Sequence, residues 1–232
     1  MESLEEEKQS TFQNLLDSLE IHSAVKKAVA KERLVFPTAL QSKLIPLVLE
    51  GQKHILVKYE DNSGIKLGFL LPILQSFLSQ EKSEFKMAVI LAHNKKRINE
   101  ISEYATNLTV FCKEVVNIKT ATKPDSVNTK ELPQILVTNP KVLLPLLANQ
   151  LVANAITILI IDQVDFHLQM DFKEELQKIG KLVSETDPQI VMTVKSVEDT
   201  DETIQEIKKS FMEAALVVRF KQSTPLIGTH DI

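Results

Sequence analysis

The sequence predicts an α/β domain in which a parallel β-sheet is covered by helices on both faces. Short runs rich in β-branched residues recur along the chain without alternation of polar and apolar residues, as expected for strands buried on both faces. Stretches with helical periodicity separate most of these runs, and strands that alternate with helices form parallel sheets. The composition agrees, because 44% hydrophobic and 25% charged residues are typical of a globular domain.

The individual elements follow from these patterns. The predicted strands are residues 54–58, 87–92, 115–118, 134–138, 156–162, 189–194 and 215–220. Helical periodicity predicts helices at 12–32, 39–50, 64–80, 95–112, 172–185 and 197–213. Pro37 and Thr38 mark the start of the second helix, and Gly51 lies where a helix stop is expected. Residues 119–133 are expected to form a long loop.

The length of 232 residues suits one large domain. We expect a single domain at residues 11–222, an acidic N-terminal arm at 1–10 and a C-terminal tail at 223–232. The only cysteine, Cys112, is expected to be a buried structural thiol, and no apolar run is long enough to span a membrane. Because the first ten residues are acidic and polar, we expect no signal or transit peptide and an intracellular protein.

The composition also limits the chemistry. With 5 glycines in the chain, a glycine-rich phosphate cradle is nearly excluded. The 5 histidines are scattered without metal-ligand spacing, and neither a Cys-x-x-Cys pair nor a Gly-x-Ser-x-Gly elbow occurs. The net charge of −4 gives no bulk attraction to a polyanion, so any RNA binding depends on a local basic patch.

Ligands of parallel sheets bind at the carboxyl ends of the strands. Binding residues are therefore expected directly after the predicted strands. The segments concerned are residues 58–64, 92–95, 138–141, 162–165 and 193–195, and each holds polar or charged side chains.

The order and spacing of these segments resemble the first domain of a DEAD-box RNA helicase. Pro37, Thr38 and Gln41 precede the loop YEDNSGIK at 59–66, which stands where the family has its phosphate loop. VILAHNKKR, ILVTNPKVL, IIDQVD and VMTVK stand where four further family blocks are found. The resemblance covers residues 21–220 and implies a RecA-like sheet of the P-loop NTPase type. The sequence is similar to the nucleolar branch of this family, which acts in large ribosomal subunit assembly. This similarity implies a nuclear or nucleolar location.

The resemblance also implies a vestigial nucleotide site. Its residues are Gln41, Ser63, Gly64, Lys66 and Asp162, and Asp162 is the implied Mg²⁺ ligand. Gln41 as a plain helix-surface residue, and Asp162 as a helix cap or a solvated residue, are open alternatives. The family aromatic that stacks on adenine is in register with Leu16, and the nearby Phe12 is expected to pack rather than to stack on a base.

The residue types at this site do not suit ATP turnover. Ile65 is in register with the lysine that bridges the phosphates, and Lys66 is in register with the hydroxyl that holds Mg²⁺. Glu60 and Asp61 add negative charge to the loop, which repels a triphosphate. Gln163 replaces the glutamate that deprotonates the attacking water, and an amide cannot accept that proton. We therefore expect no catalytic residue, no bound cofactor and no ATP hydrolysis.

The blocks that face RNA in the family are also altered. Ala92 and His93 replace a Pro-Thr pair, and Val142 replaces an arginine. Lysine and arginine side chains after two strands could still neutralise phosphates. The candidate RNA-binding residues are Lys95, Lys96, Arg97, Asn139 and Lys141. A solvated helix face explains the run of three basic residues equally well.

Three functions are consistent with these observations. The preferred hypothesis is a degenerate DEAD-box domain, a pseudoenzyme that binds RNA, a ribonucleoprotein or a protein during ribosome assembly, with neither DNA nor a membrane as a partner. The alternative is a divergent, active RNA-dependent ATPase that uses Mg-ATP, Lys66 and Asp162. It would need a second RecA-like domain, because the chain has the length of a single RecA-like domain. The third is a purely structural interaction module.

Overall fold

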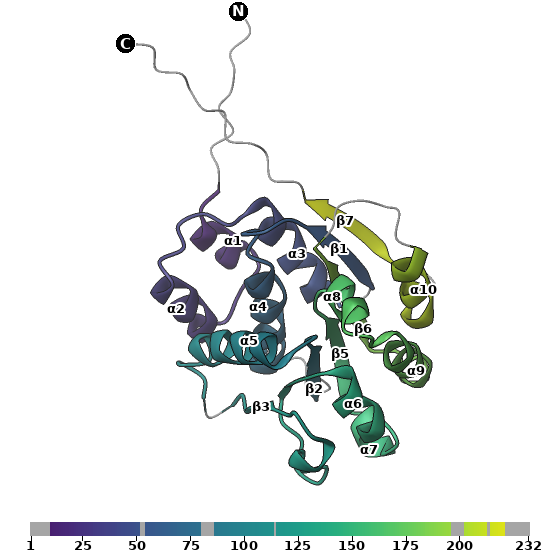
Figure 1. Cartoon of the computed structure of the whole chain (residues 1–232). Helices are drawn as coiled ribbons and strands as arrows, with labels where there is room; N and C mark the ends of the chain where they lie inside the picture. Colours follow the sequence, from purple (N-terminus) through teal and green to yellow (C-terminus); the bar gives the residue numbers. More distant parts are fainter. Residues whose placement is uncertain are drawn as a thin grey trace, which may run out of the picture.

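The sheet has the predicted class and topology. The computed structural model describes residues 10–51, 54–79, 86–113, 115–195, 202–212 and 214–220. Within these residues, seven parallel strands form one sheet in the order β3-β4-β2-β5-β6-β1-β7 (Figure 1). The strands are β1 (Ile55–Tyr59), β2 (Met87–Leu91), β3 (Ile118–Thr120), β4 (Ile135–Thr138), β5 (Ile156–Ile161), β6 (Gln189–Val194) and β7 (Leu216–Phe220).

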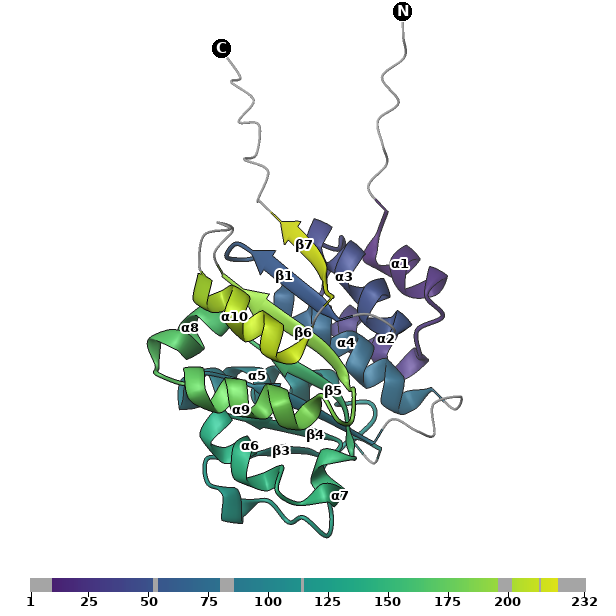
Figure 2. The ribbon, with the colours of Figure 1, turned by 90° about the vertical axis from the view of Figure 1, so that its right-hand side faces the viewer.

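Helices cover both faces of the sheet, as Figure 2 shows. One face packs in a single apolar cluster with α1 (Phe12–Ser18), α2 (Ser23–Lys31), α3 (Ala39–Glu50), α4 (Ile65–Leu78) and α5 (Lys95–Leu108). The other face packs with α6 (Pro140–Leu146), α7 (Gln150–Ala153), α8 (Val164–Gln169), α9 (Lys173–Val183) and α10 (Glu202–Phe211). None of the helices in the described ranges is long and apolar enough to cross a bilayer.

The central strands are buried because their side chains alternate between two apolar layers. Ile55 and Val57 of β1 belong to the first cluster, while Leu56 belongs to the second. This alternation explains why the central strands appear as continuous apolar runs in the sequence. The prediction of burial on both faces is wrong for the edge strand β7, where Leu216 and Val217 are 38% and 41% exposed.

Several predicted boundaries are also wrong. The helix predicted at 12–32 is two helices, because Glu20 has a positive φ of 51° and His22 caps a new helix at Ala24. The strand predicted at 115–118 is observed later in the chain, as β3 (Ile118–Thr120). The loop predicted at 119–133 contains a short 3-10 helix, η1 (Pro124–Ser126). The predicted arm, apart from Ser10, and the predicted tail lie outside the described residues.

Candidate functional site

The loop between β1 and α4 keeps the curvature of an anion-binding loop although it contains one glycine. Asn62 and Gly64 have positive φ angles of 60° and 75°. Asparagine tolerates this conformation better than most residues with a side chain, because it can hydrogen-bond locally. Gly64 is the N-cap of α4 and supplies no side-chain cap, so the first amide groups of α4 have no partner within the helix.

The start of α3 holds this loop in place. Thr38 and Gln41 form a capping box, in which the Thr38 amide donates to Gln41 Oε1 at 2.9 Å. Thr38 Oγ1 also donates to the Ser63 carbonyl at 2.6 Å, and Gln41 Nε2 donates to the Gly64 carbonyl at 3.2 Å. Gln41 is 4% exposed, so its alternative role as a helix-surface residue is wrong. A Cβ atom at position 64 would lie 2.2 Å from Gln41 Nε2, which explains why this residue is glycine.

An open cavity of about 480 Å³ lies beside the loop. Four of the predicted nucleotide-site residues, Gln41, Ser63, Gly64 and Lys66, line it, but Asp162 does not. Sequence reasoning missed several of the other lining residues. These are Leu34 and Phe36, which are 38% and 49% exposed, together with Tyr104, and Arg97 also lines the cavity although it was expected to contact RNA.

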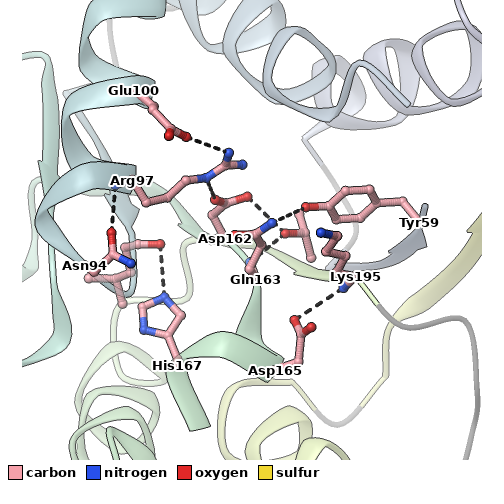
Figure 3. Close-up of polar contacts among 11 residues, drawn as sticks. Tyr59, Asn94, Arg97, Glu100, Asp162, Gln163, Asp165, His167 and Lys195 are labelled. Atoms are coloured by element: carbon pink, nitrogen blue, oxygen red, sulfur yellow. Dashed lines mark hydrogen bonds and ion pairs between the residues drawn. The ribbon is translucent and has the colours of Figure 1, made fainter. Parts of the chain in front are cut away.

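Asp162 is fully buried and its carboxylate is engaged by two side chains. Arg97 Nε, at the start of α5, donates to Asp162 Oδ2 at 2.7 Å, and Thr193 Oγ1 donates to Oδ1 at 3.2 Å (Figure 3). Arg97 Nη1 also contacts Glu100 at 3.3 Å. Burial lowers the pKa of Arg97, but the adjacent carboxylate raises it by more, so the pKa lies above its ordinary value. The Arg97 side chain therefore keeps its positive charge beside this carboxylate.

This arrangement does not fit a Mg²⁺ ion on Asp162. The Arg97 guanidinium contacts the carboxylate at 2.7 Å and would repel a second cation there, and Asp162 does not line the cavity. Lys66, a cation, occupies the position of the family hydroxyl, and its Nζ lies 5.3 Å from the centre of the Tyr104 ring. No group of three or more metal-binding acidic, histidine or cysteine residues occurs in the described part of the chain.

The residue at the position of the catalytic base is also engaged. Gln163 has a positive φ of 61°, and its backbone N–H donates to Thr193 Oγ1 at 2.8 Å. Gln163 Nε2 donates to the Tyr59 hydroxyl at 3.0 Å. Tyr59 is 3% exposed, and burial raises its pKa well above the ordinary value. Neither side chain can accept a proton from water at neutral pH.

The negative charge of the loop is partly balanced within the structure. Lys195 Nζ lies 2.9 Å from Asp61 Oδ1, and the Lys195 amide donates to Asp165 Oδ1 at 3.3 Å. Burial raises the pKa of Asp165 above its ordinary value. The repulsion expected from Asp61 is thus reduced by a cation that follows β6, although Asp61 is exposed and the pair is correspondingly weak.

Neither residue considered for the adenine-stacking position lines the cavity. Leu16 and Phe12 are both 1% exposed and lie in the core, which confirms the packing role expected for Phe12. The exposed aromatic residue at the cavity is instead Phe36. The sequence pattern did not indicate Phe36 as a cavity residue, because Phe36 directly precedes Pro37 and belongs to an irregular segment.

The candidate RNA-binding residues differ in their exposure. Lys95 and Lys96 are exposed at the start of α5, whereas Arg97 is half-buried, lines the cavity and contacts Asp162. Asn139 caps α6 by accepting a hydrogen bond from the Val142 amide at 3.1 Å. Lys141 Nζ lies 5.3 Å from the centre of the Phe172 ring.

A second, buried cluster of rings lies beneath the same edge of the sheet. His93 stacks on Phe166 with ring centres 5.1 Å apart, and His167 contacts His93 edge-on at 6.0 Å. His167 is fully buried, and burial lowers its pKa to about 3. Burial also lowers the pKa of His93. Both histidines are therefore neutral at physiological pH.

Comparison with known proteins identifies the family. A family model described as DEAD/DEAH box helicase matches residues 38–199. The ATP-dependent RNA helicase DBP9 of Vanderwaltozyma polyspora is 26% identical over 222 residues, which cover 88% of this chain and 36% of the relative. DBP9 of Meyerozyma guilliermondii is 34% identical over 151 residues, which cover 62% of this chain and 26% of the relative. The chain thus spans about a third of the length of these relatives.

Solved structures agree on the fold. A DEAD box protein from Methanococcus jannaschii superposes with a TM-score of 0.75 at 20% identity, covering 91% of this chain and 56% of that one. Mss116p bound to ssRNA and AMP-PNP gives a TM-score of 0.74 at 18% identity, covering 92% of this chain and 46% of that one. The chain belongs to the DEAD/DEAH box helicase family, and its described residues form an N-terminal RecA-like domain of that family.

Proposed function

We propose that this chain is a DEAD-box domain that does not hydrolyse ATP and that binds RNA or a ribonucleoprotein during assembly of the large ribosomal subunit. The observation that carries the first part is the contact between Arg97 Nε and Asp162 Oδ2 at 2.7 Å. It places a fixed cation on the carboxylate that the family resemblance assigns to Mg²⁺.

Two further contacts support the absence of hydrolysis. The amide of Gln163 cannot act as a general base at the position that the family resemblance assigns to one, and such a base contributes about 10²–10⁴-fold to the rate of proton-transfer catalysis. Ile65 is 6% exposed and supplies an apolar side chain where a cation would offset phosphate charge. Gln163 affects proton transfer and Ile65 affects the binding of phosphate charge, so reverting either residue to the family type would leave the other defect in place.

RNA binding is supported by exposed lysines at the carboxyl edge of the sheet. Lys95 and Lys96 follow β2, and Lys141 follows β4, which is the neighbouring strand. The relatives are named ATP-dependent RNA helicases, and the segment 160–179 resembles the ribosome-assembly branch of the family. Each lysine can neutralise one phosphate, so binding is expected to be weak and strongly dependent on salt.

An ATPase assay with single-stranded RNA and Mg-ATP tests the first part. The expected rate equals that of the Asp162→Ala variant, with and without RNA. A turnover that RNA stimulates and that Asp162→Ala abolishes would instead establish the active RNA-dependent ATPase. That second candidate is favoured by the open cavity and by the names of the relatives.

Filter binding to single-stranded RNA across a range of salt concentrations tests the second part. Replacing Lys95 and Lys96 with Gln is expected to weaken binding and to reduce the slope of log affinity against log salt by about 1.4, or about 0.7 per phosphate contact. The control replaces Lys178 and Lys181, two exposed lysines of α9, and leaves the slope unchanged. Equal slopes in both double variants would show that the proposed surface does not bind RNA, and no RNA affinity at all would favour the structural module.

A further inference from the structure

The cavity beside α4 contains two cations from the chain itself. Arg97 and Lys66 both belong to its lining, and they come from the first turns of α5 and α4. Asp61 is the acidic residue of the lining, and it contacts Lys195. The lining itself thus has two cations and one carboxylate, and the carboxylates of Asp162 and Glu100 contact Arg97 from behind the lining.

Arg97 has donors to spare after it has bound Asp162. A guanidinium carries five N–H donors, and Nε and Nη1 make the two side-chain contacts, with Asp162 and Glu100. The other N–H groups have no partner among the described residues, and the side chain is 15% exposed at the cavity. A planar guanidinium with free donors is well suited to phosphate oxygens.

The rest of the lining suits the two ends of a nucleotide. The first amides of α4 face the cavity without partners within the helix, and helix N-termini stabilise phosphate. Leu34 and Phe36 supply an exposed apolar rim for a base. Ile65 offers no cation to a terminal third phosphate, so a diphosphate suits the charges better than a triphosphate. The volume of about 480 Å³ lies within the usual range for small-ligand sites.

We propose that Arg97 takes the place of a divalent cation in this cavity, and that the cavity binds the phosphates of a nucleoside diphosphate without Mg²⁺. The guanidinium fixes the Asp162 carboxylate on one side and presents its remaining N–H groups to the ligand on the other. Lys66 and the amides of α4 complete the contacts with the phosphates. This inference goes beyond the proposed function, which needs no nucleotide.

The test measures the affinity of a fluorescent ADP analogue in Mg²⁺ and in EDTA. The unaltered chain is expected to bind equally in both buffers, within about twofold, because the Asp162 carboxylate is held by Arg97 and Thr193. Asp162→Asn is expected to bind at least as tightly as the unaltered chain and equally in both buffers, since it removes a negative charge and keeps the cation. Affinity that requires Mg²⁺, or that Asp162→Asn reduces only in Mg²⁺, would overturn the proposal.

A double variant isolates the contribution of Arg97. Arg97→Gln combined with Asp162→Asn removes both charges and the guanidinium donors, and is expected to weaken binding by about tenfold or more in either buffer. Lys178→Gln, on the exposed face of α9, is the matched control and leaves affinity unchanged. Unchanged affinity in the double variant would exclude Arg97 as a ligand contact.

The same experiment distinguishes this inference from the proposed function. If the ADP analogue binds in neither buffer, the inference is wrong, while the ATPase and RNA-binding assays still decide the proposed function. If nucleotide binds without Mg²⁺ and the chain binds no RNA, the inference holds and the RNA-binding part of the proposed function fails. Circular dichroism on each variant establishes that it is folded before its affinity is compared.

Discussion

Replacing Arg97 with Gln is expected to destabilise the domain strongly, because it leaves the Asp162 carboxylate buried without a counter-charge. Asp162 is 0% exposed and the contact is 2.7 Å long. With charge centres about 4 Å apart and an effective dielectric constant of about 20, the attraction is about 4 kcal/mol. Removing one partner of a buried pair typically costs about 3–5 kcal/mol. The hydrogen bond from Thr193 survives in the variant, so the expected loss is about 3 kcal/mol, at the lower end of that range.

Urea unfolding followed by circular dichroism measures this loss as a change in midpoint at constant slope. The matched control is Lys173→Gln, because Lys173 contacts Glu206 at the same distance of 2.7 Å but both side chains are largely exposed. That variant is expected to lose less than about 1 kcal/mol. Arg97→Gln combined with Asp162→Asn is expected to recover most of the stability, since it buries no unpaired charge. An Arg97→Gln variant no less stable than Lys173→Gln would refute the reasoning.

Three further predictions concern backbone strain, buried ionisation and helix packing. Gly64→Ala is expected to cost at least about 2 kcal/mol in urea unfolding, since it combines a left-handed φ with a clash against Gln41. Gly51→Ala, with a similar φ and open space around it, is expected to cost about 1 kcal/mol, and equal costs would contradict the role given to Gln41. Burial lowers the pKa of His167 to about 3 in the folded chain, so on acidification this imidazole is protonated more readily in the unfolded chain. Stability therefore falls as pH drops below about 6.5. The expected slope is about 1.4 kcal/mol per pH unit from this residue, and His167→Gln should flatten the pH profile; an unchanged profile would argue against a neutral buried imidazole. Gly180→Ala, although alanine favours helices by about 1 kcal/mol, is expected to destabilise the domain because its Cβ would lie 2.4 Å from a backbone oxygen of α10, and thermal unfolding that shows stabilisation would contradict the packing of α9 on α10.

The fold class could be predicted because the central strands are buried on both faces. Such strands are apolar at most positions, so β1, β2, β4, β5 and β6 are visible as nearly continuous apolar runs. The edge strands β3 and β7 carry a weaker pattern, which explains the misplaced boundary at 115–118. The short helices α6, α7 and α8 were missed, because few turns of helix give no recognisable periodicity.

The site could be located but its internal contacts could not be derived. Gln41, Gly64 and Asp162 are predicted from the order of motifs that the family resemblance gives, and Gln41 and Gly64 line the cavity while Asp162 lies behind it. Arg97 was grouped with Lys95 and Lys96, since the three are adjacent in sequence. Consecutive residues of a helix diverge by about 100°, so Arg97 points elsewhere and meets Asp162 across a separation of 65 residues. A pairing at that distance depends on the register of α5 against β5, which no local pattern specifies.

The most direct measurement is a crystal structure of the chain grown with Mg²⁺ and a non-hydrolysable ATP analogue. We expect the Arg97 guanidinium to stay on the Asp162 carboxylate, and we expect no metal to contact either carboxylate oxygen. A Mg²⁺ ion bound to Asp162, with Arg97 displaced toward solvent, would contradict it.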